Sequence, residues 1–195
     1  MTSGFRVTHS TRVTTAGFLT IDELVVEAPD GEVAHRVVVR HPGAVVVVPI
    51  VADGLAAVLV HQYRAATGME LLEVPAGKRD VEGEEPAVTA GRELEEEIGF
   101  APGRLVKLAE FFNTPGFCDE YTHLYVALDL VDAGGPRSTS PEEKHMVTEQ
   151  VALADIEVLV AQRRLVDAKS IIGLLLARAY LAGDHPGIDP SRLRG

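Results

Sequence analysis

The sequence predicts an α/β fold in which a mixed β-sheet is flanked by helices. Two observations lead to this prediction. Strand-like stretches rich in β-branched residues lie before and after one acidic helix at residues 85–98, and two more helical stretches end the chain. With 195 residues, one domain with a sizeable core is the default expectation.

The N-terminal part is predicted to be all strand. Residues 13–28 and 33–40 are the first two strands, separated by a turn at Pro29-Asp30-Gly31. Residues 44–51 and 55–63 form a hairpin, because Asp53-Gly54 is a turn dipeptide between two β-branched runs. A membrane span over residues 43–60 is the rejected alternative, since a central aspartate costs about 2.5–3.5 kcal/mol. Residues 70–74 form a short strand.

The acidic helix has clear boundary signals. Pro86 suits the first turn, where the missing N–H costs nothing, and Gly99 suits the left-handed position that ends a helix. An apolar stripe opposite the acids is expected to face the core, and it consists of Ala87, Ala90, Leu94 and Ile98.

The C-terminal half alternates strands with helices. Strands are predicted at residues 105–112, 121–130 and 145–153, a loop at 132–143, and helices at 156–163 and 168–181. The last helix is apolar almost all round, so it is expected to pack in the core or at a subunit interface.

Composition excludes several functional classes. A net charge of −11 argues against nucleic-acid and anionic-membrane partners. Cys118 is the single cysteine, which excludes an internal disulfide framework. The first residues contain no apolar signal-peptide region, so a cytoplasmic location is expected.

The acidic helix itself is the strongest candidate for chemistry. Glu93, Glu96 and Glu97 are spaced i, i+3, i+4 and share one helical face. Like charges repel at this spacing, and a group of carboxylates is a typical site for Mg²⁺ or Mn²⁺. A solvated acidic surface is the plain alternative for a glutamate-rich helix.

The order of residues around these acids resembles the Nudix box. Glu84 is followed after seven residues by Arg92-Glu93-Leu94, then by Glu96-Glu97 and by Gly99 with an apolar neighbour. The family pattern also places a glycine six residues before the first glutamate, whereas Gly77 stands seven before Glu84. The loop at residues 78–83 therefore has one additional residue, which surface loops tolerate.

Over about residues 40–160 the chain resembles the ADP-ribose pyrophosphatases of this family. It includes Gln62-Tyr63-Arg64, the run from Glu70 to Gly77, and the run from Thr114 to Glu120. The resemblance implies that the carbonyl of Ala76 binds metal together with Glu93, Glu96 and Glu97. It further implies that Arg64 contacts substrate, and it makes Glu73, Gly116 and Glu120 candidate substrate-binding residues.

The resemblance also implies a general base on the loop at residues 140–145. Glu142 is the first candidate for the base and Glu143 the second. Arg92 is expected to orient Glu96 through a charge-assisted hydrogen bond. Glu93 and Glu97 complete the expected catalytic set.

These likenesses imply an α/β/α Nudix sandwich at residues 42–183 and an irregular tail at 184–195. They also imply an N-terminal β-subdomain at residues 1–41, which can exchange across a homodimer. The expected activity is Mg²⁺-dependent hydrolysis of ADP-ribose, or a related nucleoside diphosphate sugar, to AMP and ribose 5-phosphate. Two alternatives remain: another nucleotide substrate such as GDP-mannose or an oxidised nucleoside triphosphate, and a catalytically silent nucleotide sensor.

Overall fold

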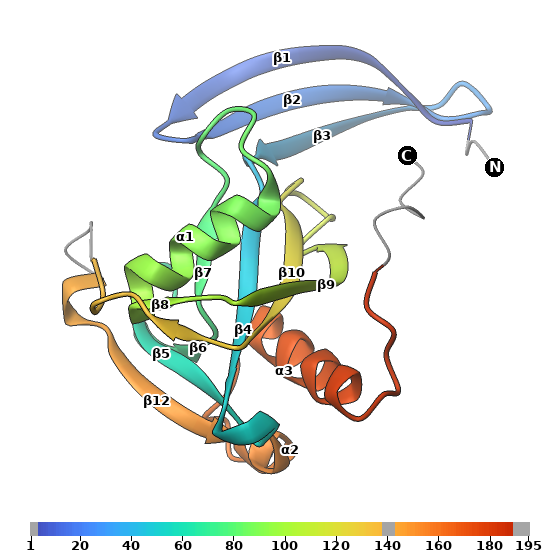
Figure 1. Ribbon diagram of the computed structural model, residues 1–195. Coiled ribbons are helices and arrows are strands. Elements are labelled where there is room, and N and C mark those ends of the chain that lie inside the picture. The colour runs from blue at the N-terminus through green and yellow to red at the C-terminus, as the bar shows by residue number, and fades with distance from the viewer. Residues whose placement is uncertain (1–3, 138–142, 189–195) are drawn as a thin grey trace. The chain divides into compact units, whose positions relative to one another are not determined.

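A computed structural model describes residues 4–137 and 143–188 (Figure 1). The chain separates into two compact units. The first contains Met1–Gly43 and Phe111–Thr122, and the second contains Ala44–Glu110 and His123–Gly195.

The first unit contains an antiparallel sheet of β1 (Arg6–Ala16), β2 (Leu19–Glu27) and β3 (Val33–Arg40), paired in that order. The prediction of one strand over residues 13–28 was wrong. Gly17 adopts a positive φ of 61° and turns the chain between β1 and β2. Every residue of β1 is exposed, so this strand has no apolar alternation from which it could be predicted.

The second unit contains a mixed sheet flanked by helices (Figure 1). Its central path runs β12-β5-β4-β10-β9, with β6 paired to β5 and β7 paired to β4. The strands are β4 (Ala44–Val51), β5 (Ala56–Arg64), β6 (Met69–Glu73), β7 (Ala76–Lys78), β9 (Arg104–Phe112), β10 (Tyr121–Leu128) and β12 (Val147–Ala152). Two short strands, β8 (Phe100–Ala101) and β11 (Val131–Asp132), pair separately and were not predicted.

The helices are α1 (Pro86–Ile98), α2 (Ile156–Ala161) and α3 (Ala168–Leu181), and they confirm the three predicted helical stretches. The hairpin around Asp53-Gly54 is also confirmed, because Val51 pairs with Ala56. None of the helices in the described ranges is long and apolar enough to cross a membrane.

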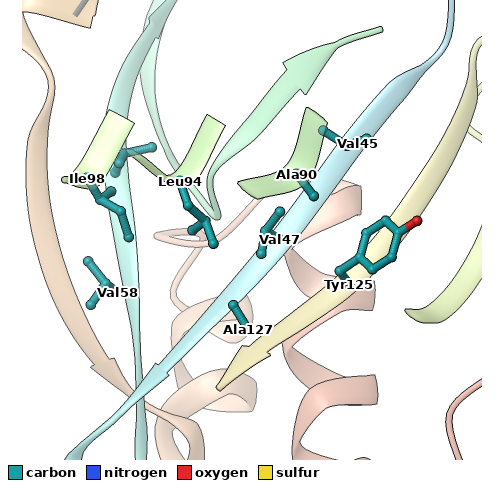
Figure 2. Packing of buried hydrophobic residues seen from close by; sticks show 9 residues of the cluster. Val45, Val47, Val58, Ala90, Leu94, Ile98, Tyr125 and Ala127 are labelled. Atoms are coloured by element: carbon teal, nitrogen blue, oxygen red, sulfur yellow. The ribbon is translucent and has the colours of Figure 1, made fainter. Parts of the chain in front are cut away.

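Helices α1 and α3 cover opposite faces of β4. Ala90 and Leu94 of α1 pack in one cluster with Val45 and Val47 (Figure 2). On α3, a side chain at Gly173 would contact Val48. Because successive side chains of a strand point to opposite faces, the odd-numbered valines face α1 and Val48 faces α3. The predicted α/β/α arrangement is therefore confirmed.

Two details of the predicted core differ in the structure. Ala87 is exposed, while Thr89 of the same turn is buried, so the apolar stripe of α1 begins at Ala90. Helix α3 buries one face through Gly173, Leu174 and Ala177. Its other apolar side chains, such as Leu175, are partly exposed.

Candidate active site

Helix α1 holds the predicted acids beside the sheet. Its last turn ends at Gly99, which has a φ of 75° and donates its N–H to the carbonyl of Glu95 at 3.2 Å. Burial of Leu94 and Ile98 against the sheet fixes the rotation of the helix. In that rotation Glu93 and Glu97 are 9% and 6% exposed, and Glu96 is half-buried. The acidic face is therefore not the solvated surface that composition alone favours.

The carboxylate of Glu97 is bound to the backbone of β7. Ala76 donates its N–H to Oε2 of Glu97 at 3.2 Å. Ala76 pairs with Val46 of β4, while the neighbouring Val47 donates its N–H to the carbonyl of Pro75. Because hydrogen-bonded and non-bonded pairs alternate along an antiparallel ladder, the N–H and C=O of Ala76 both point away from β4. The carbonyl predicted to bind metal thus lies on the side of Glu97.

Gly77 makes room for the carboxylate of Glu93. A Cβ atom at residue 77 would fall within the carboxyl group of Glu93. Glycine at residue 77 therefore allows the carboxyl group of Glu93 to lie directly against the strand. Gly77 therefore has a direct packing role although it stands one residue outside the family spacing.

Arg92 bridges the acids of the helix, as expected for Glu96. Its Nη1 donates to Oε2 of Glu96 at 3.1 Å and lies 3.0 Å from Oε1 of Glu93. Its Nη2 lies 3.6 Å from the carboxylate of Glu84. Burial disfavours the charge of Arg92, but the surrounding carboxylates outweigh burial and raise its pKa. Arg92 thus holds three carboxylates in place rather than Glu96 alone.

The donor atoms of this site suit a hard divalent cation. Within the described ranges, no three acidic, histidine or cysteine side chains already surround a metal position. The guanidinium of Arg92 lies between Glu93 and Glu96 and neutralises both of them. Although Arg92 neutralises these acids, Mg²⁺ prefers oxygen ligands of this kind: carboxylates on one helical face with a backbone carbonyl beside them. The residues present therefore fit the expected ion.

Arg64 and Glu73 bind each other. Nε and Nη2 of Arg64 donate to the two carboxylate oxygens of Glu73 at 2.8 and 2.6 Å. Glu73 is 2% exposed. The hydrogen bonds to Glu73 raise the pKa of Arg64, and Glu97 contributes to the same field. Both residues lie near the acidic site, yet their predicted contacts with substrate remain predictions.

Replacing Arg64 with alanine is expected to lower the free energy of unfolding by about 2 kcal/mol. The reason is that the buried carboxylate of Glu73 loses both of its charge-assisted hydrogen bonds. Urea denaturation measures the loss. Arg6→Ala is the matched control, because it removes only an exposed pair with Glu27 and should cost less than about 1 kcal/mol. Equal, small losses in the two variants would contradict this account.

The remaining predicted residues lie elsewhere in the chain. Gly116 and Glu120 belong to the first unit, where the carbonyl of Glu120 accepts the N–H of Asn113. Glu142 lies outside the described residues, and Glu143 begins a short 3₁₀ turn, Glu143–His145. The roles of these four residues remain predictions.

Three contacts near the site were not predicted. Thr89, which is fully buried, donates its hydroxyl to the carboxylate of Glu84 at 2.7 Å. Arg79 donates to the carbonyl of Glu84 and lies beside His123 of β10. The contact of Thr89 with Glu84 joins residues only five apart, so the sequence could have indicated it. No local pattern connects Arg79 with His123.

Comparisons with known proteins show what the chain is similar to. The NUDIX domain model matches residues 40–171. The chain is 40% identical over 145 residues to an ADP-ribose pyrophosphatase of Bacillus subtilis (strain 168), covering 74% of this chain and 77% of the relative. It is 37% identical to the methanol dehydrogenase activator of Bacillus methanolicus, covering 82% and 85% respectively. A crystal structure of an ADP compounds hydrolase is similar with a TM-score of 0.79 and 26% identity, covering 92% of this chain and 95% of that one.

Proposed function

The chain belongs to the NUDIX domain family, and we propose that it is a Mg²⁺-dependent pyrophosphohydrolase of ADP-ribose or a related nucleoside diphosphate sugar. The observation that supports this most strongly is the buried pair Glu93 and Glu97, held by Arg92 and by the Ala76 N–H. The similar ADP-ribose pyrophosphatase and ADP compounds hydrolase support the substrate class.

In the proposed reaction, water attacks one phosphorus of the diphosphate. A new P–O bond forms to the water oxygen, and the bond from that phosphorus to the bridging oxygen breaks. The products are AMP and ribose 5-phosphate. A bound Mg²⁺ or Mn²⁺ would be held by Glu93, Glu96, Glu97 and the Ala76 carbonyl, and it would neutralise phosphate charge and acidify water.

The protein side chains supply positioning and proton transfer. Arg92 keeps Glu96 oriented by a charge-assisted hydrogen bond and Glu93 by an ion pair. Arg64 binds phosphate, since its Nη1 takes no part in the pair with Glu73. Glu73 would bind ribose hydroxyls of the substrate, and Gly116 and Glu120 are further candidates for substrate binding. Glu142, with Glu143 as the second candidate, accepts the proton of the attacking water.

We also propose that the protein forms a homodimer. Residues 1–41 would form a subdomain that exchanges strands across a homodimer, residues 42–183 the hydrolase domain, and residues 184–195 a tail. The protein would act in the cytoplasm. Light scattering after gel filtration tests the dimer, and a monomeric mass at micromolar concentration would contradict it.

A substrate panel tests the function. We expect phosphate release, coupled to a phosphatase, from ADP-ribose in the presence of Mg²⁺, and its loss on chelation with recovery on adding Mg²⁺ back. GDP-mannose and oxidised nucleoside triphosphates are included to test the alternative substrates. A higher kcat/KM for either of these would replace ADP-ribose as the substrate. Nucleotide binding without any turnover would instead identify a sensor.

A further inference from the structure

A polar chain in the second unit connects the sheet with the loop that precedes Glu84. Lys107 and Glu110 of β9 form an ion pair at 2.7 Å. Glu110 also binds Nδ1 of His123 on β10 at 2.7 Å. On the other side of the ring, Nε2 of His123 lies 3.5 Å from Nη1 of Arg79.

Arg79 closes the loop that carries the additional residue. It stands directly after β7, and its Nη2 donates to the backbone carbonyl of Glu84 at 3.2 Å. The N–H of Glu84 donates to the carbonyl of Val81 at 3.2 Å. The two ends of the loop are therefore joined at Glu84, whose carboxylate is held by Thr89. This closure fixes the entry into α1 although the loop is longer than the family spacing.

The contacts of His123 select one protonation state. Glu110 is a carboxylate acceptor, so Nδ1 must carry the hydrogen, and Nε2 then presents a lone pair to Arg79, which can only donate. His123 is 8% exposed. Burial lowers the pKa of His123, Lys107 and Arg79 act in the same direction, and Glu110 opposes them without reversing the shift. The neutral ring therefore prevails at neutral pH.

We propose that Arg79 is a positioning residue for the Glu84 loop and that neutral His123 holds the guanidinium of Arg79 in place. Neither residue touches the reacting atoms in this account, which rests on the proposed hydrolase function. Protonation of His123 would place a second N–H against the guanidinium and loosen the loop. Since the pKa of His123 is lowered, this loss occurs on the acid side, as pH falls below the usual range of a histidine.

Paired substitutions at His123 separate its two contacts. His123→Asn keeps a donor near the position of Nδ1 but loses the acceptor toward Arg79, while His123→Gln keeps an acceptor near the position of Nε2. We expect His123→Asn and Arg79→Ala each to lower kcat about tenfold with KM little changed, which corresponds to losing one hydrogen bond of a charged group. The double variant should lose no more than either single variant, because both changes break one contact.

His123→Gln provides the rescue and the pH test. We expect kcat within about twofold of wild type, with the acid-side fall of kcat moved to lower pH, since glutamine does not titrate. A pH profile of His123→Gln identical to that of wild type would overturn the proposal. Additive losses in the double variant, or wild-type kcat in folded Arg79→Ala, would also overturn it.

Hydrogen exchange provides a readout that does not depend on activity. Amides of residues 78–84 should exchange faster in Arg79→Ala and His123→Asn, and at the wild-type rate in Arg104→Ala. Arg104 is the matched control, because it is an arginine of the same unit whose side-chain contact, 3.7 Å from Asp129, is exposed. If the wild-type protein cleaved no substrate, the proposed function would fail. Unchanged hydrogen exchange in Arg79→Ala would separately refute the positioning role of Arg79.

Discussion

Glu97→Gln is expected to lower kcat about 10³-fold while the protein stays folded. The change removes one negative charge from the site but preserves side-chain volume and an acceptor for the N–H of Ala76. Charge stabilisation by a divalent cation is worth several kcal/mol, and about 4 kcal/mol corresponds to about 10³ in rate. Steady-state kinetics at saturating Mg²⁺ measures the effect.

Glu95→Gln is the matched control for this variant. Glu95 lies on the same helix, two residues away, and forms a 3.6 Å ion pair with the exposed Arg137. It contributes no ligand in this account, so kcat should remain within about twofold of wild type. Equal kinetics of Glu97→Gln and Glu95→Gln would contradict the assignment of Glu97.

Gly77→Ala is expected to impair both stability and activity. The new methyl group would occupy the position of the Glu93 carboxyl, so either β7 shifts or Glu93 leaves its place. Overpacking of this kind costs about 1–3 kcal/mol, and a misplacement of about 1 Å at a catalytic group lowers rate about 10²-fold. Urea denaturation and steady-state kinetics on the same preparation measure the two effects.

Gly91→Ala is the control for a glycine substitution, because Gly91 lies within α1 but away from the contact of Gly77 with Glu93. A Cβ at Gly91 would meet its nearest neighbour, Pro102, at 3.9 Å, which is ordinary contact. Alanine in a helix interior should stabilise the protein by about 0.5–1 kcal/mol and leave kcat unchanged. A Gly77→Ala variant that behaved like Gly91→Ala would show that the close approach of the Glu93 carboxyl group to β7 is dispensable.

Features with local signals could be predicted from the sequence. Pro86 and Gly99 mark the ends of α1, and Asp53-Gly54 marks the hairpin between β4 and β5. The shared face of Glu93 and Glu97 follows from helical spacing alone. These features depend on neighbours within a few residues, so no knowledge of the folded chain is required.

Features that depend on distant partners could not be predicted. Glu93 and Glu97 are buried beside β7, and no local pattern in the sequence indicates that burial; only the family resemblance places Ala76 beside these acids. The pairing of Arg64 with Glu73 depends on the β5–β6 register, in which Val60 lies opposite Glu73. Strand β1 is wholly exposed and offers no hydrophobic period.

We propose that the acids of α1 form the catalytic site of an ADP-ribose hydrolase. Chromatographic measurement of AMP formed from ADP-ribose and Mg²⁺, for wild type beside Glu97→Gln and Glu95→Gln, tests it most directly. We expect stoichiometric AMP and ribose 5-phosphate from wild type and Glu95→Gln, and about 10³-fold slower formation from Glu97→Gln. Equal rates in all three proteins, or no AMP from the folded wild type, would contradict it.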